Sequence, residues 1–173
     1  MSAPQGSFSA GQEKAAGGGT TAQASLVKVK ITTGGGLYGT VKSQYKVGEE
    51  IPVVISLTNL TDKPLKYCLS TFIFQNRFEL HRDGQLVPQA TRLFKRAEEE
   101  DFVLKCEASA ARQFYYLQPK EPRVVDWSTL NTGIAAGYVR LGVGRYELIL
   151  KRRIECCQGP FVDSDKISFD IVP

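Results

Sequence analysis

Apolar residues recur at every second position along most of this chain. Residues 26–32 alternate Val and Ile with Lys and Thr, which is the period of a strand with one buried face. Glu50–Asn59 is rich in β-branched residues and ends in the turn-forming run Asn-Leu-Thr-Asp-Lys-Pro. Two alternating runs, Arg77–Arg82 and Gln85–Val87, flank Asp83-Gly84, a pair that favours the tight turn of a β-hairpin. These patterns predict short antiparallel strands.

Further short strands follow at a spacing of about ten residues, the rhythm of a sandwich or barrel. We expect them over residues 37–42, 65–74, 102–107, 112–117, 123–127, 138–141, 145–151 and 166–172. Only residues 92–101 favour helix, and they are too short and too charged for more than a turn or two at the surface. Because strands do not alternate with longer helices, a parallel α/β sheet is disfavoured. The predicted fold class is all-β: an antiparallel β-sandwich with a short helical insertion.

The period-two placement in the strongest strands also predicts the core. We expect buried side chains at Ile51, Val53, Ile55, Leu57, Trp127, Tyr146, Leu148 and Leu150. Residues 1–24 carry too few large apolar side chains to offset the entropy of ordering them, so they are predicted to form a flexible N-terminal arm. Residues 25–173 then make one domain of ordinary size.

Several segments resemble bacterial immunoglobulin-like domains, and in particular the intracellular proteinase inhibitor type of that sandwich. They are Tyr45–Pro52 leading into Val53–Leu57, Asn59–Pro64, Phe78–Leu80 with Asp83-Gly84, and Gly142–Leu148. The resemblance covers residues 45–172 and implies an immunoglobulin-like antiparallel β-sandwich of bacterial type. Its motifs mark turns and strand starts, so it implies a fold and carries no functional residue over to this chain.

Composition and charge limit the classes of partner that we expect for this chain. The chain is 42% hydrophobic, which excludes a fully disordered protein, and its net charge of +4 is too small to require nucleic acid. No run of 18 apolar residues occurs, so membrane insertion is not expected. The first residues lack the pattern of a signal peptide, which fits a cytosolic protein and also a mature exported one. Of these, export to the periplasm or the exterior is slightly favoured.

Four cysteines are present: Cys68, Cys106, Cys156 and Cys157. An even number permits two disulfides in three pairings, and the spacing fits no zinc site. Two interpretations stay open. In one, Cys68 and Cys106 are buried thiols that pack as small hydrophobic side chains. In the other, one of the adjacent pair at 156 and 157 forms a disulfide with Cys68 or Cys106.

The sequence offers little catalytic chemistry. His81 is the only imidazole, no nucleophile motif accompanies it, and the carboxylates fall in turns or in a charged run. No glycine-rich segment is followed by the Lys-Ser/Thr of a phosphate loop. We therefore expect no enzyme and no cofactor. The basic residues between Arg140 and Arg153 are expected to form a solvated strand edge rather than a nucleic-acid site.

The predicted function is a non-catalytic binding or structural module that acts through contacts with a protein whose identity stays open. A proteinase inhibitor would present a loop at 88–101 or 128–137, and a carbohydrate-binding domain would use exposed aromatics. Phe114-Tyr115-Tyr116 must place rings outside the core, where the segment 92–101 covers them or they form a contact surface; we favour the cover. Strand exchange or edge pairing would also allow oligomers. The candidate binding residues are Arg92, Phe94, Tyr115, Trp127 and Asn131.

Overall fold

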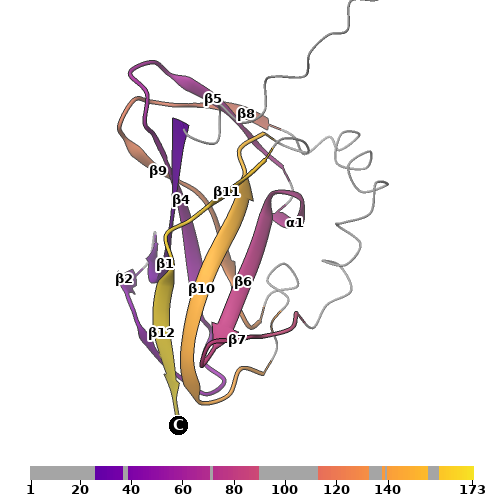
Figure 1. The fold of residues 1–173 in the computed structure, drawn as a ribbon. Helices are drawn as coiled ribbons and strands as arrows, with labels where there is room; N and C mark the ends of the chain where they lie inside the picture. Colours follow the sequence, from indigo (N-terminus) through magenta and orange to yellow (C-terminus); the bar gives the residue numbers. More distant parts are fainter. Residues whose placement is uncertain are drawn as a thin grey trace, which may run out of the picture.

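The computed structural model describes residues 26–36, 39–70, 72–89, 113–132, 138, 140–155 and 160–173. Three predicted segments lie outside these residues: the N-terminal arm, the helical stretch 92–101 and the strand at 102–107. The described residues form strands that pack face to face in two main layers (Figure 1).

The first layer is a four-stranded antiparallel sheet in the order β2-β1-β4-β9. Its strands are β1 (Val27–Gly36), β2 (Gly39–Val41), β4 (Pro52–Asn59) and β9 (Pro122–Thr129). The glycine run 34–36 forms the end of β1. Gly34 adopts a φ of 60°, and a Cβ there would lie 2.6 Å from the Cβ of Lys42, so only glycine allows the chain to turn back this tightly.

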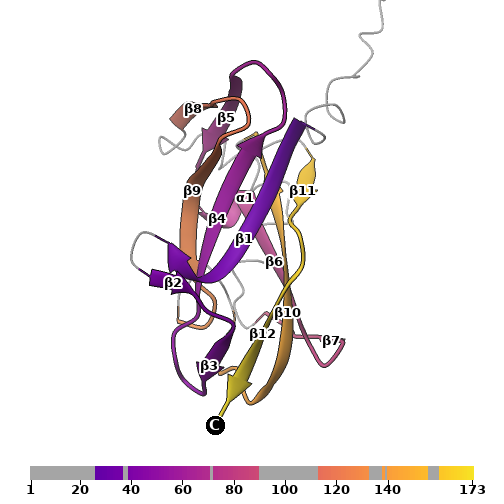
Figure 2. The same cartoon turned by 90° about the vertical axis from the view of Figure 1, so that its left-hand side faces the viewer.

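The second layer follows the order β3-β12-β10-β6-β7, with β11 pairing beside β10 (Figure 2). Its strands are β3 (Gln44–Lys46), β6 (Asn76–Arg82), β7 (Gln85–Leu86), β10 (Gly144–Arg153), β11 (Phe161–Asp163) and β12 (Ile167–Val172). The expected hairpin is confirmed: Asp83 and Gly84 both have positive φ and join β6 to β7. Within this sheet only the β3–β12 pair is parallel among the described strands.

A two-stranded ladder of β5 (Leu65–Leu69) and β8 (Gln113–Leu117) stands at the end of the sandwich opposite the C-terminus (Figure 1). The strand predicted for residues 65–74 ends at Leu69, and Phe72–Gln75 form a single helical turn, α1. Residues 138 and 140–141 are not in a strand, whereas β3 and β11 were not predicted. Within the described residues, no helix has the length and apolar character needed to cross a membrane.

The division of strands between the layers is that of an immunoglobulin-like sandwich. In chain order β1, β4 and β9 fall in one sheet and β6, β10 and β12 in the other, as strands A, B, E and C, F, G do in immunoglobulin domains. Tyr146 near the start of β10 donates its hydroxyl to the carbonyl of Gly142 at 2.8 Å. This contact has the form of the tyrosine corner of such domains.

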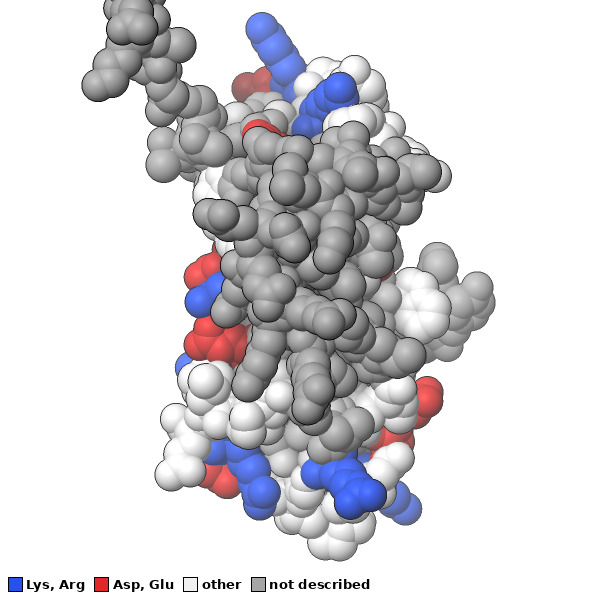
Figure 3. All heavy atoms as spheres, turned by 90° about the vertical axis from the view of Figure 1, so that its right-hand side faces the viewer, with Lys and Arg blue, Asp and Glu red and all other residues white. Residues whose placement is uncertain are grey.

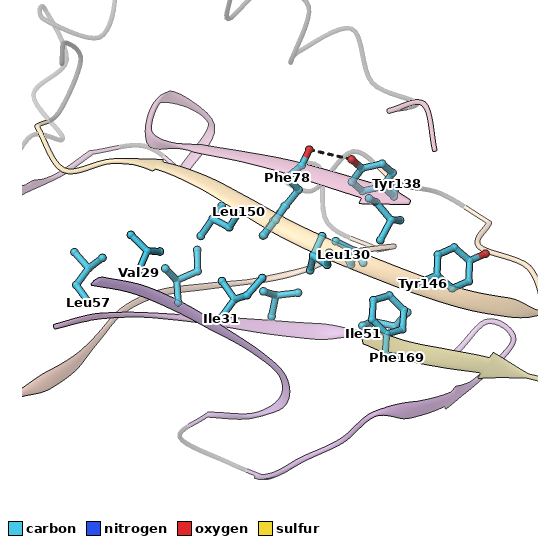
Figure 4. Packing of buried hydrophobic residues seen from close by; sticks show 14 of the residues in the cluster. Val29, Ile31, Ile51, Leu57, Phe78, Leu130, Tyr138, Tyr146, Leu150 and Phe169 are labelled. Atoms are coloured by element: carbon cyan, nitrogen blue, oxygen red, sulfur yellow. Dashed lines mark hydrogen bonds between the residues drawn. The ribbon is translucent and has the colours of Figure 1, made fainter. Parts of the chain in front are cut away.

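The core lies between the two sheets, where inward side chains of both layers meet (Figure 4). Tyr146 stacks on Phe169 with ring centroids 5.4 Å apart, and Tyr138 donates a hydrogen bond to the carbonyl of Phe78 at 3.0 Å. All but one of the predicted core residues are buried. They are Ile51, Val53, Ile55, Leu57, Tyr146, Leu148 and Leu150.

The exception is Trp127, which is 66% exposed. A β-bulge explains the error: Ile55 pairs with Asp126 but Ser56 pairs with Val124, so Val125 is an extra residue in β9. Without it Trp127 would lie opposite the buried Val53. The bulge moves it opposite Val54, on the outer face of the sheet.

Truncating a core residue should therefore lower stability much more than truncating Trp127. Leu148→Ala should lower the free energy of unfolding by about 2–4 kcal/mol, because it leaves a cavity between the sheets. Trp127→Ala should cost less than about 1 kcal/mol, since its ring is mostly in water. Urea denaturation of both variants measures the two values, and equal losses would contradict the register of β9 on β4.

Candidate binding surfaces

The ladder β5–β8 continues the ladder β4–β9 beyond a bend. Thr58 pairs with Pro122 before the bend and Leu65 pairs with Leu117 after it. The fully buried Asn59 joins the two parts: its amide nitrogen donates to the carbonyls of Lys63 at 2.8 Å and Leu117 at 3.0 Å. Its amide oxygen accepts from the backbone N–H of Thr61 at 2.9 Å, which confirms the expected Asn-Leu-Thr turn.

Two aromatic side chains of β8 lie in solvent. Phe114 and Tyr116 are each 57% exposed on one face of the strand, with the ammonium of Lys66 4.3 Å from the centroid of the Phe114 ring. The segment 92–101, which was expected to cover these rings, lies outside the described residues. Tyr115 points to the opposite face and is half-buried, with its ring 5.7 Å from that of Tyr67.

Trp127 and Val124 make a second exposed apolar area on the outer face of the four-stranded sheet. Trp127 lies opposite Val54, whose side chain is buried. The backbone N–H of Trp127 donates to Oδ1 of Asp126 at 3.0 Å. That bond fixes the backbone from which the indole projects.

Asp126 also reaches a guanidinium inside the sandwich. Arg152 is fully buried, and its Nη1 donates to Oδ1 of Asn76 at 2.6 Å and lies 3.4 Å from Oδ2 of Asp126. Asn76 donates its amide to the same carboxylate oxygen at 3.2 Å. Burial lowers the pKa of Arg152, and the charge of Asp126 opposes that change.

This burial corrects the expectation that the basic residues near the end of the chain form a solvated edge. β10 is an inner strand between β12 and β6, so alternate side chains along it must face the core. Arg152 is one of these, while its neighbours Lys151 and Arg153 are half-buried on the other face.

His81 belongs to an ion-pair cluster on the outer face of the second sheet. Its Nε2 lies 3.0 Å from Oε1 of Glu79, and the ammonium of Lys151 lies 2.9 Å from Oε2 of the same carboxylate. These contacts, first with His81 and then with Lys151, lower the pKa of Glu79. Among the described residues, no group of three His, Cys, Asp or Glu side chains could hold a metal ion.

Cys68 is disulfide-bonded and its residue is buried. Its backbone N–H donates to the carbonyl of Ile154 at 3.1 Å, which places β5 beside the end of β10. Cys106, Cys156 and Cys157 lie outside the described residues, so the pairing stays a prediction.

Of the candidate binding residues, Arg92 and Phe94 also lie outside the described residues. Asn131 uses its side chain within the molecule: its amide nitrogen donates to the carbonyl of Glu49 at 2.7 Å and its amide oxygen accepts from the N–H of Ile51 at 3.1 Å. The guanidinium carbon of Arg123 lies over the ring of Tyr115, 5.5 Å from the ring centroid.

Sequence reasoning missed Asp126 and Arg152, since no local pattern shows that two residues so far apart in the chain will meet.

Comparisons with known proteins add little to this picture. No family model matches the chain, and the curated proteins contain no significant match. Two solved structures of a CARDB domain from Pyrococcus furiosus are similar at 10% sequence identity. One, from NMR, has a TM-score of 0.37 and covers 85% of this chain and 94% of its own. The other, a crystal structure in complex with di-metal ions, has a TM-score of 0.36 and covers 84% of this chain and 87% of its own. At these scores the likeness carries no argument about function.

The contact between Asp126 and Arg152 should dominate the stability of this end of the core. Asp126→Ala should lower the free energy of unfolding by about 3 kcal/mol, because it leaves a buried guanidinium without its counter-charge. Adding Arg152→Met should recover part of that loss, since the charge is removed as well. Urea denaturation tests both, with Asp170→Ala on the exposed face of β12 as the control. A loss as small in Asp126→Ala as in the control would contradict the assignment.

The Glu79 cluster should make folding sensitive to acid. A carboxylate whose pKa is lowered in the folded state stabilises the protein above its unfolded pKa of about 4.3, and this contribution disappears as pH falls through the folded value. We expect Glu79→Gln to flatten the loss of stability between about pH 5 and pH 3, relative to the unaltered chain. The matched variant Glu121→Gln, at an exposed site, should not. Identical pH profiles for the two variants would refute a role for Glu79.

Proposed function

We propose that this chain is a non-catalytic binding module that acts through contacts with another protein. One observation carries the proposal: Phe114, Tyr116 and Trp127 are each more than half exposed on β-strands. Large aromatic side chains contribute heavily to the energy of protein interfaces when a partner covers them.

The placement of these rings suits recognition. Trp127 stands on a strand whose backbone is held by Asp126, and Phe114 and Tyr116 stand on a ladder fixed by Asn59. Rigid side chains lose little entropy when they are bound, so more of the contact energy appears as affinity. A proteinase inhibitor would instead present a loop, so we place the contact on strands rather than on residues 88–101 or 128–137.

The same proposal assigns no catalytic role to His81. Its nearest acidic partner, Glu79, is shared with Lys151, and all three side chains lie on one face of a sheet. The arrangement accounts for the histidine as part of a surface ion-pair cluster. The proposal therefore assigns the function to the surface rather than to an active centre.

Carbohydrate binding is the second candidate, because an indole exposed on the face of a sheet can stack on a sugar ring. Trp127 is the only tryptophan of the chain, so its fluorescence reports on this surface alone. Titration with a panel of oligosaccharides separates the candidates. A saturable change in emission would support carbohydrate binding, and an unchanged spectrum across the panel would count against it.

The protein-binding proposal can be tested by site-specific photo-crosslinking in the source cells. A benzoylphenylalanine at position 116 or 127 should give one discrete adduct with a second protein, because a bound partner would lie against those rings. The same group at Leu86, which is 62% exposed on β7, is the matched control and should not give that adduct. Equal adduct patterns at all the positions would refute the proposal.

A further inference from the structure

The edges of a β-sheet carry unpaired backbone groups, and proteins usually protect them against pairing with other chains. The edge strands that the structure describes differ in how they are protected against such pairing. β2, β3 and β7 are protected by shortness, with 3, 3 and 2 residues. Two longer edge strands are β9, in the first sheet, and β8, in the β5–β8 ladder, and both lie on the same side of the ribbon formed by β4, β5, β8 and β9.

β9 is protected in three ways. Pro122 has no N–H to donate, and the bulge at Val125 breaks the regular spacing of donors and acceptors. The N–H of Trp127 is already bonded to the side chain of Asp126. An added strand would find few regular partners along this edge.

β8 has none of these protections. Its register with β5 is unbroken from Gln113 to Leu117, and its sequence Gln-Phe-Tyr-Tyr-Leu has neither proline nor charge. In the part of the chain that the structure describes, no strand pairs with its other edge. Nor does any backbone N–H or carbonyl of Phe114, Tyr115 or Tyr116 bond outside the β5 ladder there. A ladder of two strands is the least stable kind of sheet, so a third strand would stabilise it.

Among the described residues, the charged side chains that contact the rings of β8 are basic. Neither β5 nor β8 contains an acidic residue. Lys66 rests over the ring of Phe114 on one face, and Arg123 rests over Tyr115 on the other. The nearby Asp62 is paired with Lys120 at 3.3 Å. Figure 3 shows basic side chains projecting at this end of the molecule. β8 therefore has a cation over each of its two faces, next to the edge where a strand would be added.

We infer that the open edge of β8 binds an extended, acidic segment of a partner protein, which adds a third strand to the β5–β8 ladder. Backbone hydrogen bonds would give affinity, and alternate side chains would meet Phe114 and Tyr116 on one face. Lys66 and Arg123 would select acidic side chains. This inference rests on the proposed binding function and names its site and the chemistry of the partner.

The test uses the full chain and a fluorescein-labelled decapeptide of alternating Val and Glu, with alternating Val and Lys as the matched peptide. Fluorescence anisotropy should show saturable binding of the acidic peptide and at least tenfold weaker binding of the basic one. Hydrogen exchange within Gln113–Leu117 should slow when the acidic peptide is present, because the new strand bonds the alternate amides that face the open edge.

Matched substitutions locate the site. Tyr116→Glu and Lys66→Glu should each weaken binding at least tenfold. Leu86→Glu, at an equally exposed apolar position, and Lys30→Glu, on an exposed position of β1, should leave it unchanged. Because all four side chains are exposed, thermal unfolding should stay close to that of the unaltered chain, which confirms that each variant is folded.

The inference fails if the two peptides bind with equal affinity, if Tyr116→Glu and Leu86→Glu have equal effects, or if exchange slows only at amides outside β8. Concentration-dependent dimers that protect β8 without peptide would also overturn it, because the edge would then take a second copy of this chain. If crosslinking at 116 or 127 traps a partner but the acidic peptide does not bind, the binding function stands and only the edge and its chemistry fail. If the peptide binds β8 but no crosslink forms in cells, the proposed function fails instead.

Discussion

The carboxylate of Asp126 is the contact on which the exposed surface of this protein depends. One oxygen meets the buried Arg152 and Asn76 of the opposite sheet, and the other accepts the backbone N–H of Trp127. A buried guanidinium requires a counter-charge, so Asp126 must point inward. Because the bulge at Val125 lies beside it, the next residue, Trp127, is then turned to the outside. An internal electrostatic requirement thus sets the position of an external aromatic.

Asn59 has a comparable role at the other end of the same ribbon. Its buried amide satisfies backbone groups of the β4–β5 turn and of β8, where the chain leaves the main sheet. A buried amide without these partners would be costly, so the bend has one well-defined geometry. The ladder that carries Phe114 and Tyr116 is placed by this junction and lies beyond the main sandwich.

The two halves of the molecule distribute polarity differently. The second sheet keeps charged groups such as Glu79 and Lys151 outside and paired with one another. The ribbon of β4, β5, β8 and β9 directs Asp126 and Asn59 to internal partners, Asp126 to the buried Arg152 of β10, and presents aromatic rings to water. A protein that places polar side chains inside and large rings outside has a surface whose free energy falls when a partner covers it. This contrast is the physical basis for proposing that a partner binds at the ribbon.

The sequence by itself determined the all-β class, the turn at Asn59, the hairpin at Asp83-Gly84 and most of the core, including Val53 and Leu148. These features depend on local turn chemistry and on the period of apolar residues, both of which can be read from a single chain. Tertiary structure alone decided the burial of Arg152 and the exposure of Trp127. Whether β10 is an inner strand, and whether β9 gains one extra residue against β4, depends on pairing between distant segments. A one-residue shift in that pairing reverses the face of every side chain that follows, and no local pattern records it.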